Sequence, residues 1–391
     1  MMRLVLSGYY GFRNSGDEAV LASILEALEE AGRARGVKVE PVVLSADPAW
    51  TSRQYGVAAV PRMKPAAVWA ALKESDGLIS GGGSLLQDAT GIGSIPYYLG
   101  IMKMARWCRK PVFIYAQGIG PVRRKIFWKP IKRAFSQAAY VSVRDEESAA
   151  LLAKFGVPAD RVHVVPDPVM GLSLPEDQPK EPAAAGAAHP DAGAQVERNC
   201  GDARGPEDHS QPPLVGVSVR FWRHDRADLD RVAAALAQLA SQRPVRLRFL
   251  PLHQGADEEA SRHVMRKIGG AAPCELAPAH EDPRQMLREI GRCSLLVGMR
   301  LHALIYAANR AVPLMGISYD PKIDAFLSRL GQRPAGTADA LDPDVFCREA
   351  ASLLDAPGAW RAQAVPQIAR MKTEAAHPAQ QIVAFMRINR R

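Results

Sequence analysis

The stretch CSLLVGMRLHALIYAANRAVPLMGISYDPKIDAF, residues 293–326, decides the fold class of this chain. Its apolar runs 294–297 and 312–317 have the length and composition of buried strands, and the residues between them have helical spacing. A strand, a helix and a second strand in this order predict a parallel pair. Because parallel strands end at the same edge of a sheet, the polar residues that follow the two runs are expected to converge.

The same alternation extends through both halves of the chain. Short apolar runs followed by helical stretches occur at 2–7, 37–44, 77–80, 111–117, 140–143, 214–219 and 245–250. The pattern predicts two doubly wound α/β domains, one over 1–174 and one over 214–375. Such sheets bind ligands at the carboxyl ends of their strands, and two such domains are expected to share one cleft.

Two segments fall outside this alternation. Residues 175–213 are rich in Pro, Ala and Gly and hold almost no large apolar side chain, so we interpret them as a flexible linker. Residues 376–391 are expected to form a C-terminal helix that packs back on the N-terminal domain. The length of 391 residues and the 47% hydrophobic content are sufficient for two globular cores.

The charge balance is compatible with three kinds of binding partner. The chain has 50 Lys plus Arg against 41 Asp plus Glu, a formal net charge of +9, which fits a small anionic substrate, an anionic lipid surface or nucleic acid. The 5 cysteines include no C-x-x-C pair, which indicates neither a disulfide framework nor a zinc site and favours the reducing cytoplasm. No apolar run approaches the ~20 residues of a spanning helix, so any membrane contact is expected to be peripheral.

The first strand is followed by a glycine-containing loop, SGYYGFRNSGDEAVL at 7–21. Gly16 lies where a helix is expected to begin, and Ser15 or Asp17 is a candidate cap for that helix. Backbone N–H groups in such a loop suit an anion, but a tight strand-to-helix connection explains the glycines equally well. The spacing matches neither the dinucleotide fingerprint nor the P-loop.

Two further strand exits of the N-terminal half carry candidate binding residues. In SGGGSLLQD at 80–88, Gly82 and Gly83 let the backbone pass close to a ligand or to a neighbouring helix, and the strand-exit position favours the ligand. In YAQGIGPV at 115–122, the amide of Gln117 is a candidate partner for a bound polar acceptor, although packing alone can explain the glycines beside it.

A fourth exit, AAYVSVRDEES at 138–148, delivers Arg144 to the end of a strand. The planar guanidinium matches a carboxylate or a phosphate with two parallel hydrogen bonds, so Arg144 is a candidate for binding an anionic donor. The alternative is a surface ion pair with Asp145 or Glu147, which the sequence alone favours.

The stretch 293–326 carries the strongest candidate site. Its first strand exit presents Arg300 and His302, and its second presents Tyr319 and Lys322. Imidazole is the side chain best suited to exchange a proton near neutral pH. Most isolated histidines are structural, and the cations around His302 shift the balance towards a functional role. Residues two apart on a helix point to nearly opposite sides, so His302 is preferred over Arg300 as the group that faces a ligand.

Other residues of the chain are weaker candidates. Arg220 in VSVRFW and His253 in FLPLHQGAD follow strands of the C-terminal half, where each lines the site or its rim. The run RRKIFWKPIKR at 123–133 interleaves six cations with apolar side chains. It suits an anionic membrane interface, and a solvated helix face with one buried stripe is the commoner explanation.

At this point the residues resemble a known family, the polysaccharide pyruvyl transferases, and among them the bacterial cell-wall enzymes of the CsaB type. The resemblance covers nearly the whole chain outside 175–213, and its motifs occur in the same order. The matching stretches are LSGYYGFRNSGDEAVL, SGGGSLLQD, YAQGIGP, SVRDEES, GVSVR and MRLHALIYAANRAVPLMGISYDPKI.

The resemblance implies a glycosyltransferase-B-like fold with two facing Rossmann-like domains. It implies transfer of a pyruvyl group from phosphoenolpyruvate to a sugar, N-acetylmannosamine in a lipid-linked precursor, as a 4,6-ketal. The donor residues of the family correspond to Arg144, His302 and Lys322, with Arg300, Gly16, Gly82 and Gly83 as further donor candidates. Gln117, Arg220, His253 and Tyr319 are candidates for the acceptor. No cofactor, metal or nucleic acid is expected, and the enzyme is expected in the cytoplasm, with peripheral contact at the inner membrane face.

Two other functions remain open at this stage. A nucleotide-sugar glycosyltransferase has the same architecture, and fold alone does not exclude it. It needs a site for a nucleoside diphosphate, whereas the C-terminal half offers Arg300, His302 and Lys322 at its strand exits. A non-catalytic basic module that binds anionic glycans or nucleic acid would depend steeply on salt and not on His302.

Overall fold

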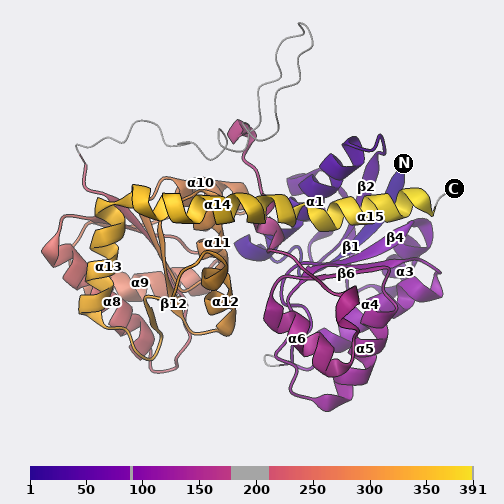
Figure 1. Cartoon of the computed structure of the whole chain (residues 1–391), viewed down its shortest axis with the longest axis horizontal. Coiled ribbons are helices and arrows are strands. Elements are labelled where there is room, and N and C mark those ends of the chain that lie inside the picture. The colour runs from indigo at the N-terminus through magenta and orange to yellow at the C-terminus, as the bar shows by residue number, and fades with distance from the viewer. Residues whose placement is uncertain (89–90, 178–210, 390–391) are drawn as a thin grey trace, which may run out of the picture. The chain divides into compact units, whose positions relative to one another are not determined.

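The computed structural model describes residues 1–88, 91–177 and 211–389, so most of the linker predicted over 175–213 lies outside the described residues. The chain divides into two compact units. Unit 1 comprises Met1–Leu172 with Met371–Arg391, and unit 2 comprises Ser173–Arg370. Each unit is built around one parallel sheet with helices against it (Figure 1). The two sheets confirm the predicted α/β fold with two Rossmann-like domains.

The sheet of unit 1 has seven strands in the order β3-β2-β1-β4-β5-β6-β7. The chain builds outward from β1 to β3 and then returns to the other side of β1, so the order reverses between β1 and β4. The strands are β1 (Met2–Ser7), β2 (Val39–Ser45), β3 (Ala58–Pro61), β4 (Gly77–Gly81), β5 (Val112–Gln117), β6 (Tyr140–Val143) and β7 (His163–Val164). The helices are α1 (Ser15–Arg33), α2 (Pro48–Tyr55), α3 (Pro65–Glu74), α4 (Ser94–Trp107), α5 (Trp128–Ser136) and α6 (Glu146–Phe155), with short 3₁₀ turns η1 (Lys125–Phe127), η2 (Ala159–Arg161) and η3 (Pro168–Gly171).

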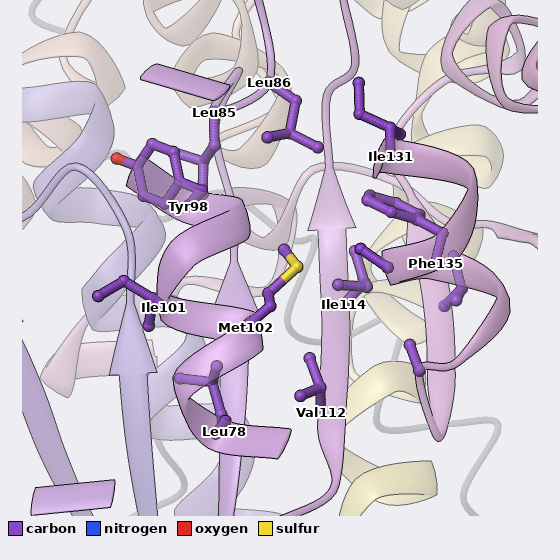
Figure 2. Close-up of a cluster of buried hydrophobic side chains, with 14 of the residues drawn as sticks. Leu78, Leu85, Leu86, Tyr98, Ile101, Met102, Val112, Ile114, Ile131 and Phe135 are labelled. Carbon is purple, nitrogen blue, oxygen red and sulfur yellow. The ribbon is translucent and has the colours of Figure 1, made fainter. Parts of the chain in front are cut away.

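Helices cover both faces of this sheet, as its strands require, since they are apolar on both sides. Helices α3, α4, α5 and α6 lie on one face, and α1 lies on the other (Figure 1). Figure 2 shows Met102 of α4 and Phe135 of α5 beside Val112 and Ile114 of β5, in the same buried cluster. Burial of such side chains contributes about 25 cal/mol for each Å² of apolar surface, which fixes α4 and α5 against the strands.

The sheet of unit 2 has six strands in the order β10-β9-β8-β11-β12-β13, which reverses between β8 and β11. The strands are β8 (Leu214–Ser218), β9 (Arg246–Phe249), β10 (Cys274–Leu276), β11 (Leu295–Gly298), β12 (Leu314–Ser318) and β13 (Gly336–Thr337). The helices are α8 (Ala227–Gln242), α9 (Ala256–Ile268), α10 (Pro283–Gly291), α11 (Leu301–Asn309), α12 (Pro321–Arg329) and α13 (Pro343–Asp355), and η4 (Pro175–Asp177) precedes them.

The last two helices lead the chain from unit 2 into unit 1. Helix α14 (Pro357–Ala375) spans the division between the units, and α15 (His377–Ile388) belongs to unit 1. There the ring of Phe385 packs edge-on against Phe113 of β5, with 5.4 Å between ring centroids. Helix α15 is the C-terminal helix that the sequence places at 376–391, and it covers the same face of the sheet as α1 (Figure 1).

Candidate functional site

At the carboxyl edge of unit 1, Arg144 follows β6 as the sequence predicts, but its guanidinium is buried. One Nη atom of Arg144 lies 3.1 Å from Oδ2 of Asp167, and the other donates to Oγ of Ser84 at 2.9 Å. Its Nε lies 3.6 Å from Oδ2 of Asp145. The pair with Asp145 was anticipated as a surface contact, whereas the side chain of Arg144 is only 6% exposed and its main partner is Asp167.

This arginine holds three of the quoted motifs together. Ser84 belongs to SGGGSLLQD, and Gly118, in YAQGIGPV, passes so close that a Cβ there would lie 3.0 Å from Nε of Arg144. Asp145 caps α6 by accepting from the backbone N–H of Ser148, whose hydroxyl in turn accepts from the N–H of Ile119. The loops after β4, β5 and β6 therefore form one hydrogen-bonded assembly around the guanidinium.

The glycine cluster after β4 packs closely on a neighbouring helix. Gly82 and Gly83 have φ angles of +58° and +72°, a conformation that favours glycine. A Cβ on Gly82 would come within 1.9 Å of Val20 in α1, and one on Gly83 would lie 3.1 Å from Asp17. The structure thus gives these glycines the packing role that the sequence left open beside ligand binding.

The loop after β1 is organised around a carboxylate of its own chain. Asn14, and not the predicted Ser15 or Asp17, caps α1, with its side chain accepting from the N–H of Gly16. The carboxylate of the buried Glu18 accepts from the backbone N–H of Gly11 at 2.9 Å and of Arg13 at 3.2 Å. Burial raises the pKa of Glu18, and these hydrogen bonds oppose that shift. The N–H groups that were expected to suit an external anion therefore already have an internal acceptor.

Gln117 lies at the end of β5 with its side chain fully buried. Among the described residues, neither its amide nitrogen nor its amide oxygen has a hydrogen-bond partner. Leaving a buried polar group unsatisfied costs about 1–3 kcal/mol, so such groups are uncommon in native proteins. Gln117 shares this feature with the hydroxyls of Ser7, Ser80 and Ser136 in unit 1, and its contact with a polar acceptor stays a prediction.

The strand exits of unit 2 bring the predicted site residues to one edge. Strands β9, β8, β11 and β12 are neighbours in that order and run parallel. The residues that follow them therefore lie at the same edge of the sheet, and Arg220 and Arg300 follow the two strands between which the strand order reverses. The predicted site residues at this edge follow three of these strands: His253 follows β9, His302 follows β11, and Tyr319 and Lys322 follow β12.

Arg300 and His302 both lie at the start of α11. Arg300 is the residue that precedes α11, and its guanidinium forms a short ion pair with Oδ1 of Asp257, whose side chain is 1% exposed. The other oxygen of Asp257 accepts from the backbone N–H of His253 at 3.0 Å. Asp257 thus connects the exits of β9 and β11. His302 is half-buried in the first turn of α11, where the positive end of the helix dipole favours a nearby anion.

Arg220 and Tyr319 are in direct contact. One Nη atom of Arg220 donates to the hydroxyl of Tyr319 at 3.1 Å, and the guanidinium lies 5.4 Å from the centre of the ring. Because β8 and β12 flank β11, this pair extends across the end of β11. The ring of Trp222, which is 52% exposed, packs on Tyr319 at 4.7 Å. Trp222 lies in the quoted VSVRFW stretch, but an exposed aromatic ring was not singled out there.

Lys322 lies in the first turn of α12, which is capped by Asp320. The carboxylate of Asp320 accepts from the backbone N–H of Lys322 at 3.1 Å, and the ammonium nitrogen of Lys322 lies 4.0 Å from the same side chain. The Lys322 side chain is 21% exposed, so its charge is partly accessible at this edge.

The described residues contain no group of three or more His, Cys, Asp or Glu side chains arranged to hold a metal ion. In the same part of the chain, no helix combines the length and the apolar character that crossing a bilayer requires.

Comparison with known protein families identifies one family whose sequence profile matches the chain. The sequence profile of the family described as polysaccharide pyruvyl transferase matches residues 14–321. No curated protein sequence matches the chain significantly.

Solved structures with a similar fold share little sequence with the chain. They include the UDP-GlcNAc 2-epimerase of Neisseria meningitidis, at 10% identity and a TM-score of 0.62 over 100% of both chains. A UDP-N-acetylglucosamine 2-epimerase of Listeria monocytogenes has 13% identity and a TM-score of 0.61, covering 98% of this chain and 95% of its own. Anabaena HepE in complex with UDP-glucose has 13% identity and a TM-score of 0.56, covering 99% of both chains. At such identities the similarity shows a shared glycosyltransferase-B-like fold.

Proposed function

Since the chain belongs to the polysaccharide pyruvyl transferase family, we propose that it transfers the pyruvyl group of phosphoenolpyruvate to a sugar of a polysaccharide precursor. The product is a 4,6-ketal, and inorganic phosphate leaves. The acceptor that we favour is N-acetylmannosamine in a lipid-linked cell-wall precursor, the chemistry of the CsaB type. The observation that carries the proposal is the edge of unit 2, where His302 and Lys322 follow adjacent parallel strands.

The donor has a carboxylate and a phosphate on a three-carbon unit, so its site needs positive charge. Lys322 provides an accessible ammonium group, and the first turn of α11 adds the positive end of a helix dipole. Arg300 uses part of its guanidinium on Asp257, and the planar group has further N–H donors for a second anion. Arg144 remains a predicted donor-binding residue, although its clearest role in the structure is to hold the loops of unit 1.

The reaction can be written with each proton assigned. The imidazolium of His302 gives its proton to the methylene carbon, which becomes a methyl group and leaves the adjacent carbon electrophilic. One sugar hydroxyl adds to that carbon and returns its proton to His302. The bond between carbon and the phosphate oxygen breaks, phosphate leaves, and the second hydroxyl closes the ketal while its proton goes to phosphate. Positive charge near the leaving group stabilises the developing phosphate.

The residues that we propose for the acceptor include two neighbouring aromatic rings of unit 2, Tyr319 and the exposed Trp222. The rings of Tyr319 and Trp222 offer apolar faces to the C–H face of a pyranose, and Arg220 fixes the hydroxyl of Tyr319 beside them. We propose that Tyr319, Trp222 and Arg220 orient the sugar and that His253 lies at the rim of the acceptor site. Gln117 of unit 1 stays a predicted acceptor-binding residue.

A lipid-linked acceptor also implies where the enzyme works. We propose that it acts in the cytoplasm and meets its acceptor by peripheral contact with the inner membrane face, without a metal or cofactor and without nucleic acid.

Lys322→Ala is expected to weaken phosphoenolpyruvate binding by about tenfold or more, because an ion pair that is partly shielded from water contributes more than ~1 kcal/mol. Isothermal titration of the purified chain with phosphoenolpyruvate measures this change. The matched control is Lys267→Ala on α9, whose ammonium pairs with Asp230 away from the strand exits, and its affinity should be unchanged.

The same titration, repeated with UDP-sugars, distinguishes pyruvyl transfer from nucleotide-sugar glycosyl transfer. The neighbours of similar fold were solved with UDP-GlcNAc and UDP-glucose, so a UDP-sugar is the natural competitor ligand. Binding of phosphoenolpyruvate and indifference to UDP-GlcNAc and UDP-glucose support pyruvyl transfer. Micromolar affinity for a UDP-sugar with none for phosphoenolpyruvate would indicate a nucleotide-sugar glycosyltransferase.

A further inference from the structure

The positive charge of this chain is concentrated in one segment. Residues 89–144 contain 11 Lys and Arg and no Asp or Glu. Subtracting these 11 charges from the formal +9 of the whole chain leaves −2 for all other residues together. The excess of the protein is therefore a property of the segment that forms α4, β5, η1, α5 and β6.

The structure places many of these charges on the outer side of one helical layer of unit 1. Helices α4 and α5 are neighbours, and Arg106 near the end of α4 donates to Gln137 just after α5 at 2.7 Å. Their apolar sides face the sheet, as Figure 2 shows for Met102 and Phe135. The opposite sides expose Lys103 of α4 and Lys129, Lys132 and Arg133 of α5. Burial and then the charge of Arg133 lower the pKa of Arg106.

The same layer exposes large apolar side chains among the cations. Trp107 at the end of α4 is 62% exposed, and Trp69 of the adjacent α3 is 40% exposed, with 6.5 Å between their ring centroids. The ammonium of Lys103 lies 4.7 Å from the Trp107 ring. In η1, which leads into α5, Ile126 is 76% exposed. We call the exposed side chains of Trp69, Lys103, Trp107, Ile126, Lys129, Lys132 and Arg133 the α4–α5 surface.

We propose that the α4–α5 surface docks on a bilayer that contains anionic phospholipids. Crowding of like charges destabilises a protein surface unless an anionic partner compensates it, and a solvated helix face gives no reason for exposed tryptophans. Tryptophan rings favour the boundary between headgroups and acyl chains, and Lys and Arg favour anionic headgroups. Nucleic acid accounts for the charge, but it does not account for an isolated exposed Ile126.

The docking surface goes beyond the proposed reaction and does not depend on it. It uses residues of unit 1 alone, none of which is assigned to the donor or the acceptor. If the acceptor is lipid-linked, docking raises its local concentration at the enzyme. Binding to vesicles is measured without either substrate, so a failure of this inference is distinguishable from a failure of the catalytic proposal.

The test is sedimentation of the full chain with large vesicles at near-physiological salt. One set is pure phosphatidylcholine and the other contains about a third phosphatidylserine, which provides the negative surface potential. We expect binding to the anionic vesicles only. The triple variant Lys129→Glu, Lys132→Glu and Arg133→Glu should lose about a hundredfold in partition coefficient, since each surface cation contributes about fivefold.

A matched control reverses the same number of charges elsewhere. Arg262, Arg266 and Lys267 are exposed on α9 of unit 2, and their change to Glu should leave vesicle binding within about twofold if the site is specific. The apolar contribution is tested by the double variant Trp107→Ser with Ile126→Ser, which should weaken vesicle binding several-fold. Brominated lipids should quench the tryptophan fluorescence of the wild type more than that of Trp107→Phe.

Two results would overturn the inference. Equal loss of binding in the α5 and α9 triple variants would show attraction by net charge alone. Two results together would identify a polyanion and not a bilayer as the partner. The variant Trp107→Ser with Ile126→Ser would bind vesicles as well as the wild type does, and the wild type would bind an RNA of equal charge more tightly than it binds the vesicles.

Discussion

Replacing His302 with alanine is expected to lower the turnover of pyruvyl transfer by roughly two to four orders of magnitude, the usual contribution of a positioned general acid. The fold should be retained, because His302 is a half-buried residue in the first turn of α11 and is not part of the apolar core. Donor affinity should change much less than turnover, since the imidazole acts on the methylene carbon and not on the anionic groups.

The matched control is His263→Ala in α9, whose imidazole contacts Asp230 at 2.7 Å on another side of unit 2. It should keep parental turnover. A His302→Gln variant retains a hydrogen-bonding side chain without acid function, so it should be as inactive as His302→Ala. Parental turnover in purified His302→Ala protein refutes the assignment of the acid. A rise in KM with unchanged kcat makes His302 a binding residue instead.

Asp257→Ala is expected to destabilise unit 2 by about 3–5 kcal/mol, the range for removing one partner of a buried ion pair. The substitution leaves the guanidinium of Arg300 in a mostly buried position without its carboxylate and removes the acceptor for the N–H of His253. Both strand exits that Asp257 connects should loosen, so donor binding should weaken as well. Denaturant unfolding with a tryptophan signal measures the change in the free energy of unfolding.

Two further variants distinguish loss of the ion pair between Asp257 and Arg300 from a general disruption of unit 2. Asp257→Asn keeps an oxygen acceptor at the same place and should cost clearly less than Asp257→Ala. The double variant Asp257→Ala with Arg300→Met removes both charges, so it should be more stable than Asp257→Ala alone. A double variant that is no more stable than Asp257→Ala, or a change below about 0.5 kcal/mol in Asp257→Ala, would show that the pair contributes little.

The sequence predicted the central strands of both sheets because their buried residues form apolar runs. Strand β6 at Tyr140–Val143 has the predicted bounds, and β11 differs from the predicted 294–297 by one residue. The strands that the sequence did not reveal are β3, β7, β10 and β13, which have two to four residues and include the outermost strand at each edge of both sheets. Such strands are half-exposed, so their side chains need not form an apolar run.

The position of a site residue was more predictable than its contacts. Arg144 follows its strand as expected, yet its partner Asp167 lies 23 residues further along the chain, and Asp257 lies 43 residues before Arg300. Spacing in a sequence carries no information about pairs that only the tertiary fold creates. The cap of α1 illustrates a local limit, because Asn14, Ser15 and Asp17 are all residue types that cap helices.

The most direct test of the proposed reaction is its product. The purified chain is incubated with phosphoenolpyruvate and a synthetic lipid-linked disaccharide that ends in N-acetylmannosamine, with His302→Ala as the control. We predict that mass spectrometry finds the disaccharide with one added pyruvyl ketal and that one phosphate is released for each ketal formed. Sugar transfer from a UDP-sugar to the same acceptor, with no ketal and no phosphate release from phosphoenolpyruvate, would contradict the proposal.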